Sequence, residues 1–114
     1  MELEQKVTLL NEWLNDKKAN NILNIDVSDR CNFTEYIIIC TGTATLHNKA
    51  IADFIIDKAK ENKIKILSKE GMTACTWILL DMNDVILHIF SVDTLEMYKL
   101  EDLWKERNDK RTLS

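Results

Sequence analysis

Asp81 and Asp84 are the two side chains best spaced for metal-assisted catalysis. They flank Met82-Asn83 at the end of an aliphatic run, and paired carboxylates are the oxygen ligands through which Mg²⁺ acts in phosphoryl transfer. That chemistry also needs a glycine-rich turn to hold the phosphates, and the chain offers only Gly42 near an expected helix start. We therefore expect no catalytic residues and no enzymatic activity.

The histidines and cysteines lack the spacing of a metal site. His47 and His88 fall on different expected elements, and Cys31, Cys40 and Cys75 form no CxxC pair. Zinc sites usually draw their ligands from such pairs, and an odd number of cysteines does not complete a disulfide framework. We expect no metal, no cofactor and buried or half-buried free thiols. Two roles stay open for His47: tying the following strand, or binding an anion at the helix start.

The composition is that of an acidic globular domain. The 114 residues carry a net charge of -4, with 46% hydrophobic and 30% charged residues. Such a chain gains little from neutralising phosphates, so its charge suits a basic protein partner better than a nucleic acid. The N-terminus lacks the regions of a secretion signal, and no apolar stretch reaches the ~20 residues of a membrane helix. We expect a cytoplasmic protein without membrane contact.

Hydrophobic spacing predicts the elements that position these side chains. Helical spacing covers residues 2–18, a segment from a Thr43 or Thr45 cap to about Asn62, and residues 93–106. Strand patterns cover residues 23–27, 35–41, 64–67, 76–81 and 84–90. The order α-β-β-α-β-β-β-α predicts an α/β fold: one domain of residues 1–107, with a mixed, about five-stranded sheet flanked by helices, and a short tail of residues 108–114.

The last two strands are predicted to form a hairpin with Met82-Asn83 as its loop. Asp81 then pairs with Asp84, and Trp77 with His88. Because side chains alternate across a strand, one face is purely aliphatic and should pack on helices: Ile78, Leu80, Val85, Leu87 and Ile89. The other face is mixed: Cys75, Trp77, Leu79, Asp81, Asp84, Ile86, His88 and Phe90.

The mixed face has the composition of a protein-recognition surface. It combines an aromatic anchor, apolar neighbours and charges at the edge. Two alternatives remain for it. A second helix layer over this face would make Trp77 a core residue, and the same face could support a homodimer.

Ordered motifs over about residues 5 to 105 resemble the Iojap/RsfS family of ribosomal silencing factors. The segments that resemble TGTS…H..A.AD, EG…W.LLD and DV..H.F…Y.LE.LW are residues 41–53, 70–81 and 84–104. The chain departs from the family at Leu46 and Leu95, where the family often has arginine, so it lacks the basic groups at these two positions. Asn83 replaces the hairpin glycine, a mild change.

The resemblance implies a nucleotidyltransferase-like fold without its catalytic residues. It further implies binding to a basic ribosomal protein of the large subunit, number fourteen in the standard scheme, at the subunit interface. Bound there, the protein would sterically block association of the small subunit and repress translation in starvation or stationary phase. A catalytically active nucleotidyltransferase-like enzyme and an oligomeric ribosome-assembly or regulatory adaptor are the alternatives.

The family's contacts can be carried over to matching positions of this chain. The partner-binding candidates are Trp77, Leu79, Asp81, His88, Tyr98 and Glu101. Trp77 and Tyr98 would supply buried anchor area, while Asp81 and Glu101 would pair with basic residues. Further lysines occur late in the second helix and beyond it, interleaved with acidic residues: Lys58, Lys60, Lys63, Lys65 and Lys69. We expect these lysines to form a solvated face, with at most a minor contact to ribosomal RNA.

Overall fold

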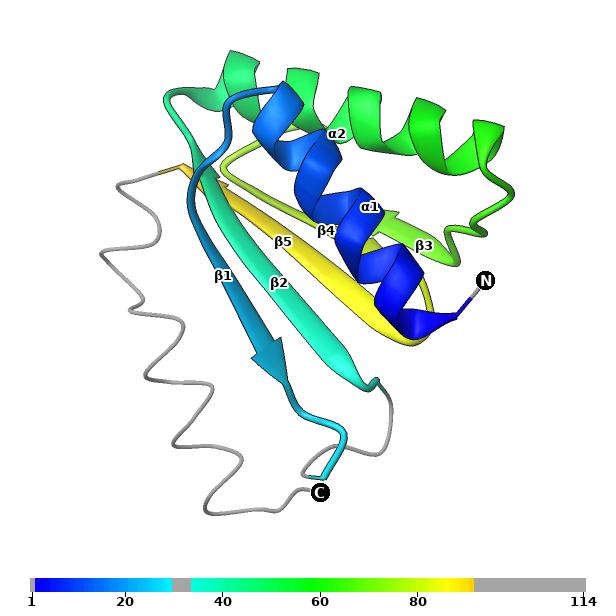
Figure 1. Cartoon of the computed structure of the whole chain (residues 1–114). Helices are drawn as coiled ribbons and strands as arrows, with labels where there is room; N and C mark the ends of the chain where they lie inside the picture. Colours follow the sequence, from blue (N-terminus) through cyan, green and yellow to red (C-terminus); the bar gives the residue numbers. More distant parts are fainter. Residues whose placement is uncertain (1, 30–33, 92–114) are drawn as a thin grey trace.

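Two helices and five strands form along residues 2–29 and 34–91, the part of the chain that the computed structural model describes (Figure 1). They are α1 (Leu3–Asp16), β1 (Asn20–Asp26), β2 (Tyr36–Gly42), α2 (Thr45–Glu61), β3 (Ser68–Glu70), β4 (Trp77–Asp81) and β5 (Val85–Ser91). The helix predicted over residues 93–106 and the tail lie outside the described residues. Within these residues, neither helix is long and apolar enough to cross a membrane.

The strands form one mixed sheet in the order β1-β2-β5-β4-β3. β2 and β5 are parallel, whereas the other three neighbouring pairs are antiparallel. Parallel neighbours cannot be joined by a tight turn, and here α2, β3 and β4 carry the chain from β2 to β5. The predicted α/β class with a mixed, five-stranded sheet is confirmed.

Both helices pack on the same face of this sheet (Figure 1). Leu10 and Leu14 of α1 and Ile51 and Ile55 of α2 are fully buried against it. The strand side chains they meet include the whole aliphatic face that the alternation predicted: Ile78, Leu80, Val85, Leu87 and Ile89. That prediction is confirmed.

The opposite face of the sheet carries a second, smaller apolar cluster. Its buried members are Val27, Ile37, Ile39 and Phe90, with Leu23 and Ile25 packed against them. Among the described residues, no helix contributes to this cluster. The two faces of the sheet therefore differ within the described part of the chain, one under two helices and one formed by strand side chains.

Two local predictions around α2 are wrong. The helix is capped by Ala44 without a side-chain hydrogen bond, and not by Thr43 or Thr45. At the other end, Lys63 has a left-handed φ of 60°, and the N–H of Ile64 donates to the carbonyl of Ala59 at 2.8 Å. This closes the helix in the manner of a Schellman cap. Because the backbone N–H of Ile64 belongs to this helix cap, it does not take part in a strand. The strand predicted over residues 64–67 forms over residues 68–70 instead.

The hairpin register differs from the prediction by two residues. Asp81 pairs with Ile86, Leu79 with His88 and Trp77 with Phe90. The tight loop is residues 83–84, since Met82 and Val85 are hydrogen-bonded and Asn83 takes the left-handed conformation with φ 77°. A shift of two residues keeps every side chain on its own face, whereas a shift of one would exchange the faces. The predicted pairing is wrong, and the aliphatic face is right.

Candidate functional site

Four of the predicted contact residues lie together on one face of the hairpin. Trp77, Leu79 and Asp81 come from alternate positions of β4, and His88 comes from the neighbouring β5. Alternation turns them away from the face under α1 and α2. Trp77 is 39% exposed, and the other three are half-buried. We call these four residues the recognition face.

Trp77 is held by two aromatic neighbours on β5. Its ring stacks on Phe90 with centroids 4.9 Å apart, and its Nε1–H donates to Nδ1 of His88 at 3.0 Å. Burial lowers the pKa of His88 to about 4, so the imidazole is neutral at pH 7 and Nδ1 can accept this bond. In the neutral ring the proton then sits on Nε2, which is a donor. The tryptophan is therefore fixed in orientation before any partner binds.

Phe90 is the supporting residue that the list of contact candidates missed. It is fully buried, it stacks on both Trp77 and His88, and it pairs directly with Trp77 across the strands. The alternation had placed Phe90 on this face, but the predicted register set it opposite another residue. The alternation of side chains therefore indicated the right face for Phe90, but the error in the register hid its pairing with Trp77.

Asp81 lies on the recognition face, and its carboxylate hydrogen-bonds to the hairpin loop. One of its oxygens accepts the N–H of Asn83 at 2.9 Å. Within residues 2–29 and 34–91, no lysine or arginine lies within 4.0 Å of this carboxylate. Its charge is therefore not paired with a cation of the described residues.

Asp84 does not join Asp81 in a carboxylate pair. Its oxygen lies 2.6 Å from Nζ of Lys6 on α1, and both side chains are mostly buried. The same ammonium approaches the carbonyl of Met82 at 3.4 Å. Asp84 is thus part of the contact between α1 and the hairpin, and its predicted place on the mixed face is wrong. No group of three His, Cys, Asp or Glu side chains suited to a metal occurs in the described segments.

Cys75 also leaves the mixed face. Its φ is 61°, in the left-handed region, and its side chain packs in the cluster under the helices. Cys75 and Cys40 are buried free thiols, as predicted, and burial raises the pKa of the Cys40 thiol to about 12. Cys31 lies outside the described residues.

His47 ties the two helices together. Its Nδ1 accepts the N–H of Thr43 at 2.9 Å, and its Nε2 lies 2.7 Å from the carbonyl of Lys17 at the end of α1. His47 therefore contacts the preceding helix, and the predicted contact with the following strand is wrong. His47 also lines a shallow hollow of about 560 Å³ together with Lys17 and Lys18.

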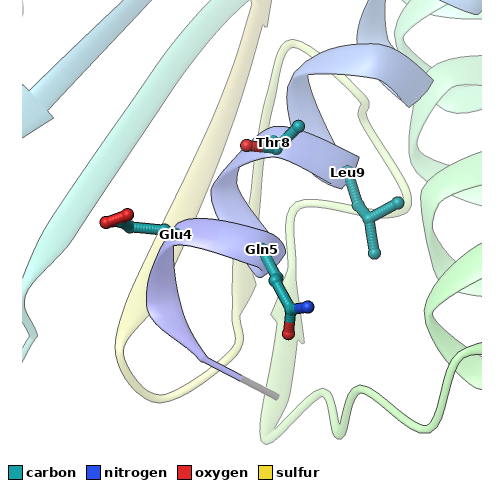
Figure 2. A pocket seen from close by; sticks show the side chains of 4 residues that line it. All are labelled: Glu4, Gln5, Thr8 and Leu9. Carbon is teal, nitrogen blue, oxygen red and sulfur yellow. The ribbon is translucent and has the colours of Figure 1, made fainter.

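A second hollow, of about 380 Å³, lies on the surface of α1 (Figure 2). It is lined by Glu4, Gln5, Thr8 and Leu9. In Figure 2 these side chains spread outward in different directions from two turns of the helix and do not converge on one point. The hollow adds nothing to the recognition face. The remaining contact candidates, Tyr98 and Glu101, lie outside the described residues.

Comparisons with known proteins find related sequences and a similar fold. The family model described as "Ribosomal silencing factor during starvation", RsfS, matches residues 1–114. The ribosomal silencing factor RsfS of Haemophilus influenzae is 37% identical over 98 residues, which are 86% of this chain and 96% of the relative. A crystal structure of a protein from Chromobacterium violaceum superposes with a TM-score of 0.88 at 30% identity, covering 92% of this chain and 88% of that chain.

A more distant relative comes from mouse. The protein named "Mitochondrial assembly of ribosomal large subunit protein 1" is 29% identical over 105 residues. These residues are 90% of this chain but 46% of the mouse protein.

Proposed function

The chain belongs to the RsfS family of ribosomal silencing factors, and from this membership we propose that it binds the large ribosomal subunit and keeps the small subunit from joining. Its direct partner would be a basic protein of the large subunit, number fourteen in the standard scheme. Silencing would then be an act of occlusion in the cytoplasm. No substrate is converted, because one bound surface simply excludes another.

The observation that carries this proposal is the recognition face. An exposed tryptophan that is stacked and hydrogen-bonded in place loses little side-chain freedom on binding. Such fixed aromatic anchors supply much of the affinity of protein interfaces. Asp81 stands at the edge of the same face and is not neutralised by a described cation. An aromatic anchor, Trp77, beside a negative charge, Asp81, is complementary to a basic protein surface.

The net charge of -4 supports the same choice of partner. Opposite charge on the ribosomal protein would steer the encounter, while ribosomal RNA would repel most of the chain. Lys63, Lys65 and Lys69 are exposed beyond α2, and we propose at most a minor contact with RNA through them. Reversing the charges of Lys63 and Lys65 should leave the affinity for large subunits within about twofold.

The test is reassociation of separated ribosomal subunits followed by sucrose-gradient sedimentation. We expect the pure protein to suppress the intact-ribosome peak and to migrate with free large subunits. Trp77→Ala should weaken capture of the purified ribosomal protein by at least about thirtyfold, since losing such an anchor costs ~2 kcal/mol or more. Tyr98→Ala should act in the same direction.

Leu67→Ala is the matched control for these variants. Leu67 is another large exposed apolar side chain, 51% exposed, just before β3, so its loss should leave capture unchanged. Undiminished subunit joining at large molar excess of the protein would overturn the proposed function. A homodimer formed through the recognition face would compete with ribosome binding and would appear as a concentration-dependent loss of capture.

A further inference from the structure

Cys75, two residues before Trp77, has a backbone conformation that side chains with a Cβ rarely adopt. Its φ is 61°, in the left-handed region that disfavours every residue except glycine and, to a lesser degree, asparagine and aspartate. In a regular strand Cys75 and Trp77 would share one face. The left-handed turn sends the Cys75 side chain to the helix-side core instead. This turn therefore sets the direction from which the chain enters β4 and presents Trp77.

The turn is held on one side by its own loop. The N–H of Cys75 donates to the carbonyl of Gly71 at 2.9 Å. Gly71 itself has a φ of 78°, and a Cβ there would collide with the carbonyl of Trp77. The carbonyl of Thr76 accepts the N–H of Ser91 at 3.0 Å. The loop thus lies directly against the first residue of β4.

The other restraint comes from α2. Asn48 is fully buried, and its Nδ2 donates to the carbonyl of Cys75 at 2.8 Å. The second polar atom of this amide, Oδ1, is buried with no hydrogen-bond partner in the described part of the chain. Buried polar atoms without partners are rare because they destabilise the fold. An aliphatic side chain at this position would avoid that cost, so the single bond to Cys75 is what Asn48 contributes.

Gly42, at the end of β2, provides the space for this amide. A Cβ at Gly42 would overlap Oδ1 of Asn48. The nearest atom is the end of a side chain, and the backbone N of Asn48 follows at 3.2 Å, so an alanine at this position would first displace the amide of Asn48. Gly42, Asn48 and Cys75 therefore form one connected support under the start of β4.

We propose that Asn48 is a positioning residue for the recognition face. Through the carbonyl of Cys75 it holds the left-handed turn, and the turn aims Trp77 at His88 and at the partner. The binding consequence rests on the proposed function; the effect on Trp77 does not. Without the amide, the Cys75 carbonyl loses its donor and the turn relaxes toward ordinary extended backbone, which moves the indole away from His88.

The first test is Asn48→Leu, which removes the donor and keeps the branched shape of the side chain. The indole N–H resonance of Trp77, assigned with Trp77→Phe in the full ¹⁵N-labelled chain, reports the hydrogen bond to His88 directly. We expect this resonance to shift or broaden, and binding to purified large subunits to weaken about tenfold. Ile55→Val is the matched control: Ile55 is fully buried in the same helix, and its side chain cannot hydrogen-bond to the turn. This control should leave the resonance in place.

Two further variants complete the test. Gly42→Ala pushes on the same amide from the other side and should move the resonance in the same way, so it decides the matter if Asn48→Leu does not fold. Cys75→Gly in the Asn48→Leu background should restore both readouts, because glycine adopts the left-handed turn without strain. A resonance in Asn48→Leu that matches Ile55→Val would overturn the positioning role. If the resonance moves while Trp77→Ala binds like wild type, the positioning role stands and the proposed contact surface is wrong.

Discussion

Among single residues, His88 has the largest influence on the recognition face, because its neutral state determines the orientation of Trp77. Nδ1 can accept the indole N–H of Trp77 at 3.0 Å only while it carries no proton. Burial provides this condition by lowering the pKa of His88 to about 4. Protonation would remove the acceptor and place a charge among stacked rings. The orientation of Trp77 is thus linked to the protonation state of one imidazole.

We expect stability to fall as the pH drops from about 6.5 to 4. In that window the unfolded chain has a protonated His88 and the folded chain a neutral one, so the unfolded state binds more protons and acid favours it. The loss attributable to this group is at most about 3 kcal/mol. Urea unfolding at several pH values measures it. His88→Gln keeps an acceptor without a titration in this range and should flatten the dependence; an equal slope in both proteins would contradict the assignment.

At the scale of elements, the hairpin is joined to α1 by one ion pair. Lys6 and Asp84 lie 78 residues apart along the chain, and their side chains are only 12% and 21% exposed. The pair therefore fixes where the loop of residues 83–84 sits relative to the N-terminal helix. It also explains why Asp84 is absent from the recognition face, since its carboxylate is committed to Lys6.

Lys6→Met should lower the free energy of unfolding by about 2 kcal/mol, because it leaves a mostly buried carboxylate without its partner. Denaturant unfolding at pH 7 provides the measurement. Lys49→Met is the control, since the pair between Lys49 and Asp53 has both side chains about half exposed. That change should stay within about 0.5 kcal/mol of wild type. Equal losses in the two variants would show that the Lys6 pair does not join α1 to the hairpin.

At the scale of the whole molecule, charge and anchor should act on different rate constants. The chain carries a net charge of -4, which speeds the encounter with a basic partner over distances of the Debye length, roughly 10 Å at 0.1 M salt. The aromatic anchor acts only after docking, so it governs dissociation. Silencing would then combine fast capture of the large subunit with slow release.

Raising the salt concentration from about 50 to about 500 mM shortens the screening length from roughly 14 to roughly 4 Å. This change should slow association with the purified ribosomal protein about tenfold. Dissociation should change much less. Trp77→Ala should do the reverse, with faster dissociation and nearly unchanged association. Binding kinetics measured with the partner immobilised on a sensor surface resolve the association and dissociation rate constants. Association that is indifferent to salt would remove the electrostatic part of the proposal.

Within the described residues, the sequence patterns alone were enough to predict both helices, the strands β1, β2, β4 and β5, and the aliphatic face of the hairpin. Apolar side chains recur with the period of a helix or a strand, and this local periodicity survives tertiary packing. The aliphatic face of the hairpin was therefore right even though every partner in the register was wrong, because an error of two residues preserves the alternation. Trp77, Leu79, Asp81 and His88 were brought to one face for the same reason.

Only the tertiary structure decided which atoms meet across long stretches of chain. Asp84 binds Lys6 of α1, His47 reaches the carbonyl of Lys17, and the amide of Asn48 supports the turn at Cys75. None of these pairs leaves a periodic trace in the sequence, because each depends on how separate elements pack and on a few left-handed backbone positions. Local patterns specify which side of an element is apolar, whereas the packing of the elements selects the partners of its polar groups.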